Sequence, residues 1–185
     1  MKKQPDNVLE LTTVSVRVHP ALREYLLAIN NNSDIIFPKW GGRLQGLLAM
    51  YLTNVPSGYK PAPISGRPDE IRIVLHNGKK KTWSYMKGRI FEVNPLFIAY
   101  ITDTGQRVIA DHLMDGFKQT FRAYMEGALG NNTELSIKEA IEEFCNDYSI
   151  ELEHVTYDML RKDWYRYRAR KEEDPSRPLI YTSFV

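Results

Sequence analysis

Six basic side chains are concentrated in one predicted helix near the end of the chain. Residues 161–171 hold six bases against one acid. At helical spacing Leu160, Trp164 and Tyr167 fall on one face, so we expect that face to pack on the preceding helix and the bases to cover the flanks and back. Phosphate backbones favour such a surface, because each phosphate that a cation neutralises releases condensed counterions. The predicted nucleic-acid contacts are Arg161, Lys162, Arg166, Arg168, Arg170 and Lys171.

Tyr165 lies among these bases, and an aromatic ring there could stack on a base or pack against a sugar. The alternative is that arginines near a helix C-terminus complement the macrodipole and pair with the segment before them. That segment is strongly acidic, because residues 133–158 hold eight acids against one base, Lys138. The sequence leaves both interpretations open.

A second basic cluster falls on a predicted β-hairpin in the middle of the chain. Residues 71–76 are mostly apolar, Asn77-Gly78 tolerates the positive φ angles of a type I′ turn, and residues 79–86 form the returning strand. A basic β-ribbon with aromatic side chains can enter a groove or grip a single strand, whereas lysines on an edge strand also protect it from aggregation. Protection explains this cluster better when it is taken alone, and the presence of two clusters favours binding. The residues are Lys79, Lys80, Lys81, Lys87 and Arg89, with Trp83 and Tyr85 as aromatic support.

The motifs that could carry catalysis lack their partner residues. Ser84-Tyr85-Met86-Lys87 matches the Ser-x-x-Lys of penicillin-binding enzymes, but it lies on a predicted strand and the companion motifs are missing. Cys145 lies beside the apolar stripe of a predicted helix with no adjacent base to activate it, so we expect a core residue.

Two further clusters could bind an ion. Asp111, His112 and Asp115 share a helix at spacings that could touch a metal, but no second ligand cluster is evident. The segment 40–43, Trp-Gly-Gly-Arg, opens a helix and could hold an anion on its backbone amides, yet it matches neither a Walker loop nor a Rossmann fingerprint. The sequence therefore predicts a non-enzymatic protein with no catalytic residue, no metal site and no cofactor.

Composition indicates a globular chain in a reducing compartment. The 185 residues are 43% hydrophobic and 26% charged, enough to bury a core. The single cysteine excludes an intrachain disulfide framework, so we expect a cytoplasmic location, which means the host cytoplasm if a phage encodes the protein. No apolar run approaches the length that spans a bilayer, so we expect no membrane contact.

The elements that must position these residues suggest an α+β fold. Residues 1–55 are predicted to run strand–helix–helix: valines alternate with polar residues from 14 to 18, a helix begins at Pro20 with Ile29 in its apolar stripe, and a second helix covers residues 43–53.

The remaining chain divides into four segments. Residues 56–69 form a connector with four prolines and two glycines, and residues 70–132 hold the hairpin, or a small antiparallel sheet, followed by a long helix. Residues 133–173 form a basic αα-hairpin, in which Ser136 and Glu139 are the expected capping box of the first helix and Thr156 is the expected cap of the second. Residues 174–185 form a tail.

The strand–helix–helix order of residues 11–53 resembles that of ribbon-helix-helix proteins. This resemblance implies a dimer whose paired strands insert Thr13, Ser15 and Arg17 into the major groove. The linker of residues 30–40 is longer than in that family, and an edge strand with two packed helices is the alternative.

The segment Ser136–Lys171 resembles the C-terminal helical hairpin of small uncharacterised phage and mobile-element proteins, through Glu142-Glu143-Phe144-Cys145 and residues 164–168, Trp-Tyr-Arg-Tyr-Arg. That resemblance implies a DNA-transaction or particle-assembly setting and assigns no catalytic residue. The turn from Ser149 to Val155 is longer than is usual in helix-turn-helix units.

Together these patterns predict a nucleic-acid-binding protein that contacts phosphates through the basic helix and the basic hairpin, with DNA favoured over RNA. The alternative is a structural or assembly subunit of a phage particle or multiprotein complex, in which the chain is a homo-oligomer or part of a larger protein assembly.

Overall fold

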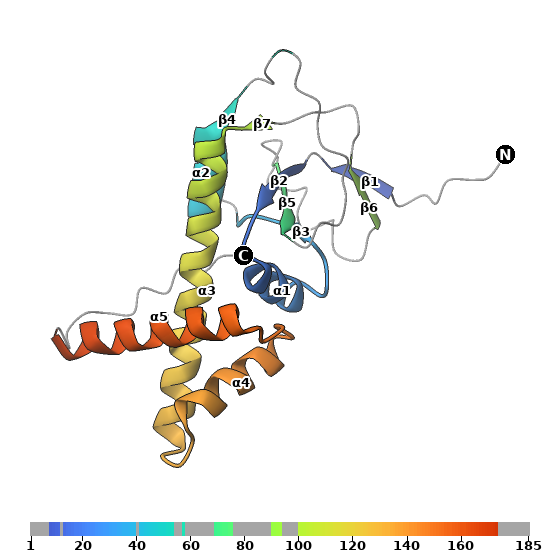
Figure 1. The fold of residues 1–185 in the computed structure, drawn as a ribbon. Helices are drawn as coiled ribbons and strands as arrows, with labels where there is room; N and C mark the ends of the chain where they lie inside the picture. The colour runs from blue at the N-terminus through green and yellow to red at the C-terminus, as the bar shows by residue number, and fades with distance from the viewer. Residues whose placement is uncertain are drawn as a thin grey trace. The chain divides into compact units, whose positions relative to one another are not determined.

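The computed structural model describes residues 8–11, 13–39, 41–53, 57, 69–75, 90–93 and 100–173. The fold is α+β, as the sequence predicts (Figure 1). The elements in chain order are β1 (Val8–Leu11), β2 (Thr13–Arg17), α1 (Pro20–Ile29), β3 (Ile35–Ile36), α2 (Arg43–Tyr51), β4 (Leu52–Thr53), β5 (Glu70–Val74), β6 (Ile90–Val93), β7 (Tyr100–Ile101), α3 (Asp103–Asn131), α4 (Ile137–Asp147) and α5 (His154–Glu173).

These elements group into two compact units. One unit holds all the described strands, α2 and the first turns of α3 as far as Ala110. The other holds α1, the rest of α3, α4 and α5. Helix α1 therefore groups with the C-terminal helices, although it directly follows β2 in the chain. None of the described helices is long and apolar enough to cross a bilayer.

The strand unit is built around β5, which lies between β2 and β3. The predicted alternation in residues 13–17 is confirmed, because Val14 and Val16 are buried while Arg17 is exposed. Strand β2 pairs antiparallel with β5 of the same chain, with Val16 opposite Ile71. The ribbon-helix-helix resemblance implies instead a strand that pairs with a second copy.

The predicted hairpin is only partly described. Strand β5 confirms a strand in residues 71–74, but β2 pairs along one edge and β3 pairs at Arg72 and Ile73 along the other. Both edges of β5 are thus occupied at these positions, so the neighbours of this strand are not those of the simple hairpin that the sequence suggests. The predicted returning strand lies outside the described residues.

Helix α2 ends earlier than the sequence predicts. It stops at Tyr51, and the next two residues, β4, pair antiparallel with β7. Gly105, in the first turn of α3, is required by this packing, because a Cβ there would lie 2.5 Å from Tyr51 Cβ and 2.7 Å from Ile101 Cγ2. Thr102 Oγ1 accepts a hydrogen bond from Gly105 N and therefore caps the start of α3.

The core of the helical unit is aromatic. Phe117, Phe121 and Phe144 have no exposed surface, and the Phe121 and Phe144 rings meet edge to face with centroids 5.1 Å apart. Tyr25 of α1 joins this cluster, with its ring centroid 5.1 Å from that of Phe117. Ile29, which the sequence places in the buried stripe of α1, is 40% exposed, because that stripe ends one turn earlier at Leu26.

Helix α4 begins with the predicted capping box. The Glu139 amide donates to Ser136 Oγ at 3.2 Å, and the Ser136 amide donates to Glu139 Oε2 at 2.9 Å. Two of the amides that lack helical partners are thereby satisfied.

We expect Ser136→Ala to lower the free energy of unfolding by about 1 kcal/mol, because the Glu139 amide loses its acceptor. Thr133→Ala is the matched control, since Thr133 is an exposed turn residue three positions before the cap. Urea denaturation followed by far-UV circular dichroism measures both. Equal stabilities for the two variants would contradict the capping role.

Candidate nucleic-acid interface

Helix α5 begins two residues before the predicted cap. Its first residue is His154, and the Tyr157 amide donates to the Glu153 carbonyl at 2.9 Å. Thr156, expected to cap the helix, lies in its first turn and is 4% exposed. The cap prediction is therefore wrong, because this threonine belongs to the inward face of the helix.

The inward face of α5 combines apolar and polar side chains. Leu160 is fully buried and Trp164 is 4% exposed, as the sequence predicts. Asp163 is also buried, at 7% exposed. The Trp164 indole nitrogen Nε1 is buried and has no hydrogen-bond partner in the described structure. The surface that attaches α5 is thus more polar than a purely aromatic stripe.

Asp163 forms a bidentate ion pair with Arg122 of α3. Arg122 Nε donates to Asp163 Oδ2 at 2.7 Å, and Arg122 Nη2 donates to Asp163 Oδ1 at 2.6 Å. The Arg122 guanidinium also lies 5.5 Å from the centroid of the Tyr167 ring. The only acid among residues 161–171 is therefore occupied inside the helical unit and does not neutralise the outward bases.

A second polar contact between α3 and α5 centres on Glu126. Tyr167 donates its hydroxyl to Glu126 Oε1 at 2.8 Å, and the Lys171 ammonium donates to the same oxygen. Burial alone would raise the pKa of the Glu126 carboxyl, but the hydrogen bonds from Lys171 and Tyr167 outweigh it and lower that pKa. The bond to Glu126 raises the pKa of Lys171. Lys171 is thus engaged against α3, unlike the other predicted contact residues of α5.

The sequence contains a signal for these two contacts in the spacing of their residues. In a helix of 3.6 residues per turn, Asp163, Tyr167 and Lys171 are spaced four apart and fall beside Leu160 on the inward face. Their partners, Arg122 and Glu126, have the same spacing on α3. Two matched rows of this kind on neighbouring helices are typical of a polar helix–helix contact.

The five other predicted bases of α5 are exposed. Three have a carboxylate within ion-pair distance, and each of these carboxylates belongs to α5 itself. Asp158 lies 3.5 Å from Arg161 and 3.6 Å from Lys162, and Glu172 lies 3.6 Å from Arg168. The side chains of these three bases remain 46%, 61% and 50% exposed, respectively.

Arg166 and Arg170 differ from those three. Arg170 Nε donates to the Arg166 carbonyl at 3.1 Å, which leaves the terminal guanidinium nitrogens of Arg170 outside that bond. Among the residues that the structure describes, no carboxylate lies within ion-pair distance of the Arg166 guanidinium. Tyr165, beside Arg166, is 53% exposed.

The acidic segment 133–158, which the alternative interpretation expects to neutralise these bases, reaches two of them through Asp158, its last residue. The acids of this segment that lie in α4 make other contacts. Glu142 pairs with Lys138 one turn earlier in α4, and Asp147 accepts the hydroxyl of Tyr124 at 2.8 Å. Burial, followed by that bond, raises the pKa of Tyr124 to about 12. Among the ion pairs of the described residues, none joins a carboxylate of α4 to a base of α5.

The second basic cluster is the one predicted on the β-hairpin. Its members Lys79, Lys80, Lys81, Lys87 and Arg89, and the aromatic residues Trp83 and Tyr85, lie outside the described residues.

The segment Ser84–Lys87 lies outside the described residues. In the described part of the chain, no group of three or more His, Cys, Asp or Glu side chains lies close enough to hold a metal ion. Cys145 is 1% exposed, and burial raises the pKa of its thiol to about 12, with a further contribution from the charge of Glu24. This thiol is a core residue, as expected.

Comparison of the chain with protein-family models, with curated proteins and with solved structures finds no match in any of the three.

Proposed function

We propose that this protein binds nucleic acid, with DNA favoured over RNA, and that the outward side of α5 contacts the phosphate backbone. One observation carries the proposal: α5 is fixed by its inward face, while Arg161, Lys162, Arg166, Arg168 and Arg170 remain exposed. Asp163, the one acid within residues 161–171, is bound to Arg122.

The ion pairs within α5 do not prevent this contact. Their distances of 3.5–3.6 Å are long for charge-assisted hydrogen bonds, and all three join side chains that are partly or largely exposed. Such pairs contribute about 0–1 kcal/mol each and are screened by salt. A phosphate can therefore replace either carboxylate at little cost in free energy.

The geometry of α5 favours one row of bases within this set. Lys162, Arg166 and Arg170 recur every four residues and so form one ridge, with about 6 Å of helix rise between neighbours. At about 100° per residue, this ridge lies on the opposite flank from Arg161, which faces α4. A polyanion on the ridge avoids the acidic side chains of α4, so we assign it the main contact and give Arg161 and Arg168 a supporting one.

Fluorescence anisotropy with a short labelled DNA duplex, and with the RNA duplex of the same sequence, tests the proposal. The logarithm of the association constant should fall linearly with the logarithm of the salt concentration. Arg166→Gln should flatten that slope by about one unit, because one phosphate contact is lost.

The control is Lys138→Gln, which removes a base that is 70% exposed on α4 and should leave the slope unchanged. Salt-independent binding, or no binding at low salt, would refute the proposal. Tighter binding to RNA would change the favoured nucleic acid but keep the interface.

A subunit of a protein assembly is the second candidate. A cleft of about 460 Å³ between α4 and α5 favours it, because this cleft presents carboxylates as well as bases and fits part of a protein better than a polyanion.

A further inference from the structure

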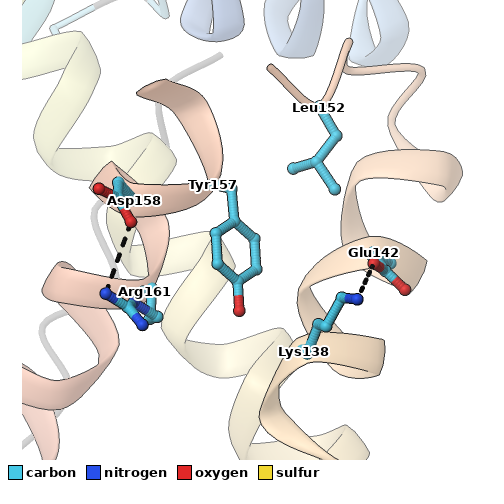
Figure 2. Close-up of a pocket in the computed structure, with 6 residues that line it drawn as sticks. All are labelled: Lys138, Glu142, Leu152, Tyr157, Asp158 and Arg161. Carbon is cyan, nitrogen blue, oxygen red and sulfur yellow. Dashed lines mark ion pairs between the residues drawn. The ribbon is translucent and has the colours of Figure 1, made fainter. Parts of the chain in front are cut away.

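The cleft in the helical unit lies between the outer sides of α4 and α5 (Figure 2). Its volume is about 460 Å³, within the range of sites that hold a ligand. Six side chains line it: Lys138 and Glu142 from α4, Leu152 from the connecting turn, and Tyr157, Asp158 and Arg161 from α5.

Each wall of the cleft carries one ion pair. Lys138 Nζ lies 3.7 Å from Glu142 Oε1, and Arg161 Nη2 lies 3.5 Å from Asp158 Oδ1. Figure 2 shows the Tyr157 ring between the two walls. The Arg161 guanidinium lies 5.9 Å from the centroid of that ring, so the cleft combines charge with an aromatic surface.

The two pairs are aligned, which gives the cleft an acidic end and a basic end. Glu142 and Asp158 lie toward Leu152, while Lys138 and Arg161 lie at the far end (Figure 2). The alignment follows from the chain path, because α4 runs toward the connecting turn and α5 runs away from it. Along α4 the base precedes the acid, and along α5 the acid precedes the base, so the two acids come to the same end of the cleft.

We propose that this cleft docks a helix of another protein that presents a basic side chain, an apolar side chain and an acidic side chain along one face. The basic group of the partner lies against Glu142 and Asp158, and its acidic group lies against Lys138 and Arg161. The apolar side chain packs on Tyr157 and Leu152. This docking does not require nucleic-acid binding and deepens the assembly role.

The spacing of the charges supports a helical partner. Lys138 and Glu142 are four residues apart and Asp158 and Arg161 three apart, so the two ends are separated by about 4.5–6 Å of helix rise. Side chains three or four positions apart on a partner helix have the same separation.

The exposure of the lining supports a macromolecule over a small molecule. The side chains of Lys138, Glu142 and Arg161 are 70%, 42% and 46% exposed. A site that encloses a small molecule buries most of the ligand surface, whereas a shallow groove suits a segment that crosses it. The two carboxylates at one end disfavour a polyanion.

The probe is a blocked, alanine-rich peptide of about 18 residues, long enough to form a helix in water. It carries one arginine and one glutamate four positions apart, with a leucine between them on the same face. Two control peptides carry glutamate at both charged positions or arginine at both. We expect the mixed peptide to bind most tightly and to shift the backbone amide NMR signals of Leu152 and Tyr157.

The matched protein variant is Lys138→Glu combined with Glu142→Lys. It keeps the net charge and the ion pair within α4, and it places the acid nearer the helix N-terminus, where the macrodipole favours it. The dissociation constant for the mixed peptide should rise about tenfold, because two attractive contacts become repulsive.

Four results would overturn the proposal: equal binding of the mixed peptide by the variant and the wild type, equal binding of all three peptides by the wild type, no binding of the mixed peptide, or tightest binding of the two-glutamate peptide. The last result would place the probe on the outward bases of α5. The peptide series uses the wild-type protein, so it decides the question even if the variant fails to fold. A failure here leaves the salt dependence of nucleic-acid binding untouched.

Discussion

Replacing Asp163 with alanine is expected to lower the free energy of unfolding by about 3 kcal/mol. Asp163 is 7% exposed, and its carboxylate accepts hydrogen bonds from Arg122 Nη2 at 2.6 Å and from Arg122 Nε at 2.7 Å. Without it, a cation whose side chain is only 20% exposed loses its counterion and two hydrogen bonds. Urea denaturation followed by far-UV circular dichroism measures the loss.

Two control variants separate this effect from ordinary surface electrostatics. Asp158→Ala removes a carboxylate that bridges Arg161 and Lys162 on the outside of α5, and we expect a change of less than about 0.5 kcal/mol. Asp163→Leu combined with Arg122→Met should recover much of the lost stability, because an apolar pair leaves no buried charge. Equal effects of Asp163→Ala and Asp158→Ala would show that the buried pair does not hold α5.

Removing the ridge of α5 is expected to have the largest effect on binding. The triple variant Lys162→Gln, Arg166→Gln and Arg170→Gln should weaken DNA binding on the order of a thousandfold at low salt, because counterion release contributes roughly a factor of ten for each phosphate contact there. Stability should change little, since all three side chains are exposed. Fluorescence anisotropy and urea denaturation measure the two properties on the same samples.

The control for net charge removes three exposed bases elsewhere: Arg43→Gln, Arg107→Gln and Lys138→Gln. It changes the charge of the protein by the same amount, so a long-range electrostatic effect would weaken binding equally in both triple variants. We expect the control to bind within a few-fold of the wild type, as a local contact requires. Similar losses in the two variants would contradict an interface on α5.

Local patterns were enough to predict much of the helical unit. Apolar residues recur at helical spacing along residues 109–125, which predicts a long helix with these residues inward. Ile109, Leu113 and Met125 are indeed buried. The capping box at Ser136 located the start of α4, because its two hydrogen bonds join residues only three apart in the chain.

Contacts between distant segments could not be predicted in this way. Strand β5 pairs with β2 and β3, which precede it by more than thirty residues, and no local signal specifies those partners. The turn signal at Asn77-Gly78 suggested a neighbour in sequence instead.

Only part of the candidate site could be predicted, because some of its contacts also join segments that are distant in the chain. Exposure of Arg166 and Arg170 follows from the apolar stripe on the opposite side of their own helix. The engagement of Lys171 with Glu126 depends on a helix that ends about twenty residues before α5 begins, so α5 alone does not reveal it. In the sequence, Asp163 is a single acid within a run of bases, and this pattern does not predict its burial. The ion pair with Arg122 in the structure explains that burial.

The guanidinium NMR signals of the protein test the central claim most directly, because each arginine Nε–H reports on its own surroundings. On addition of a short DNA duplex at low salt, the signals of Arg166 and Arg170 should shift, while the signal of Arg122, bound to Asp163, should stay in place. Unchanged signals for Arg166 and Arg170 in the presence of bound DNA would contradict contact between α5 and the phosphate backbone.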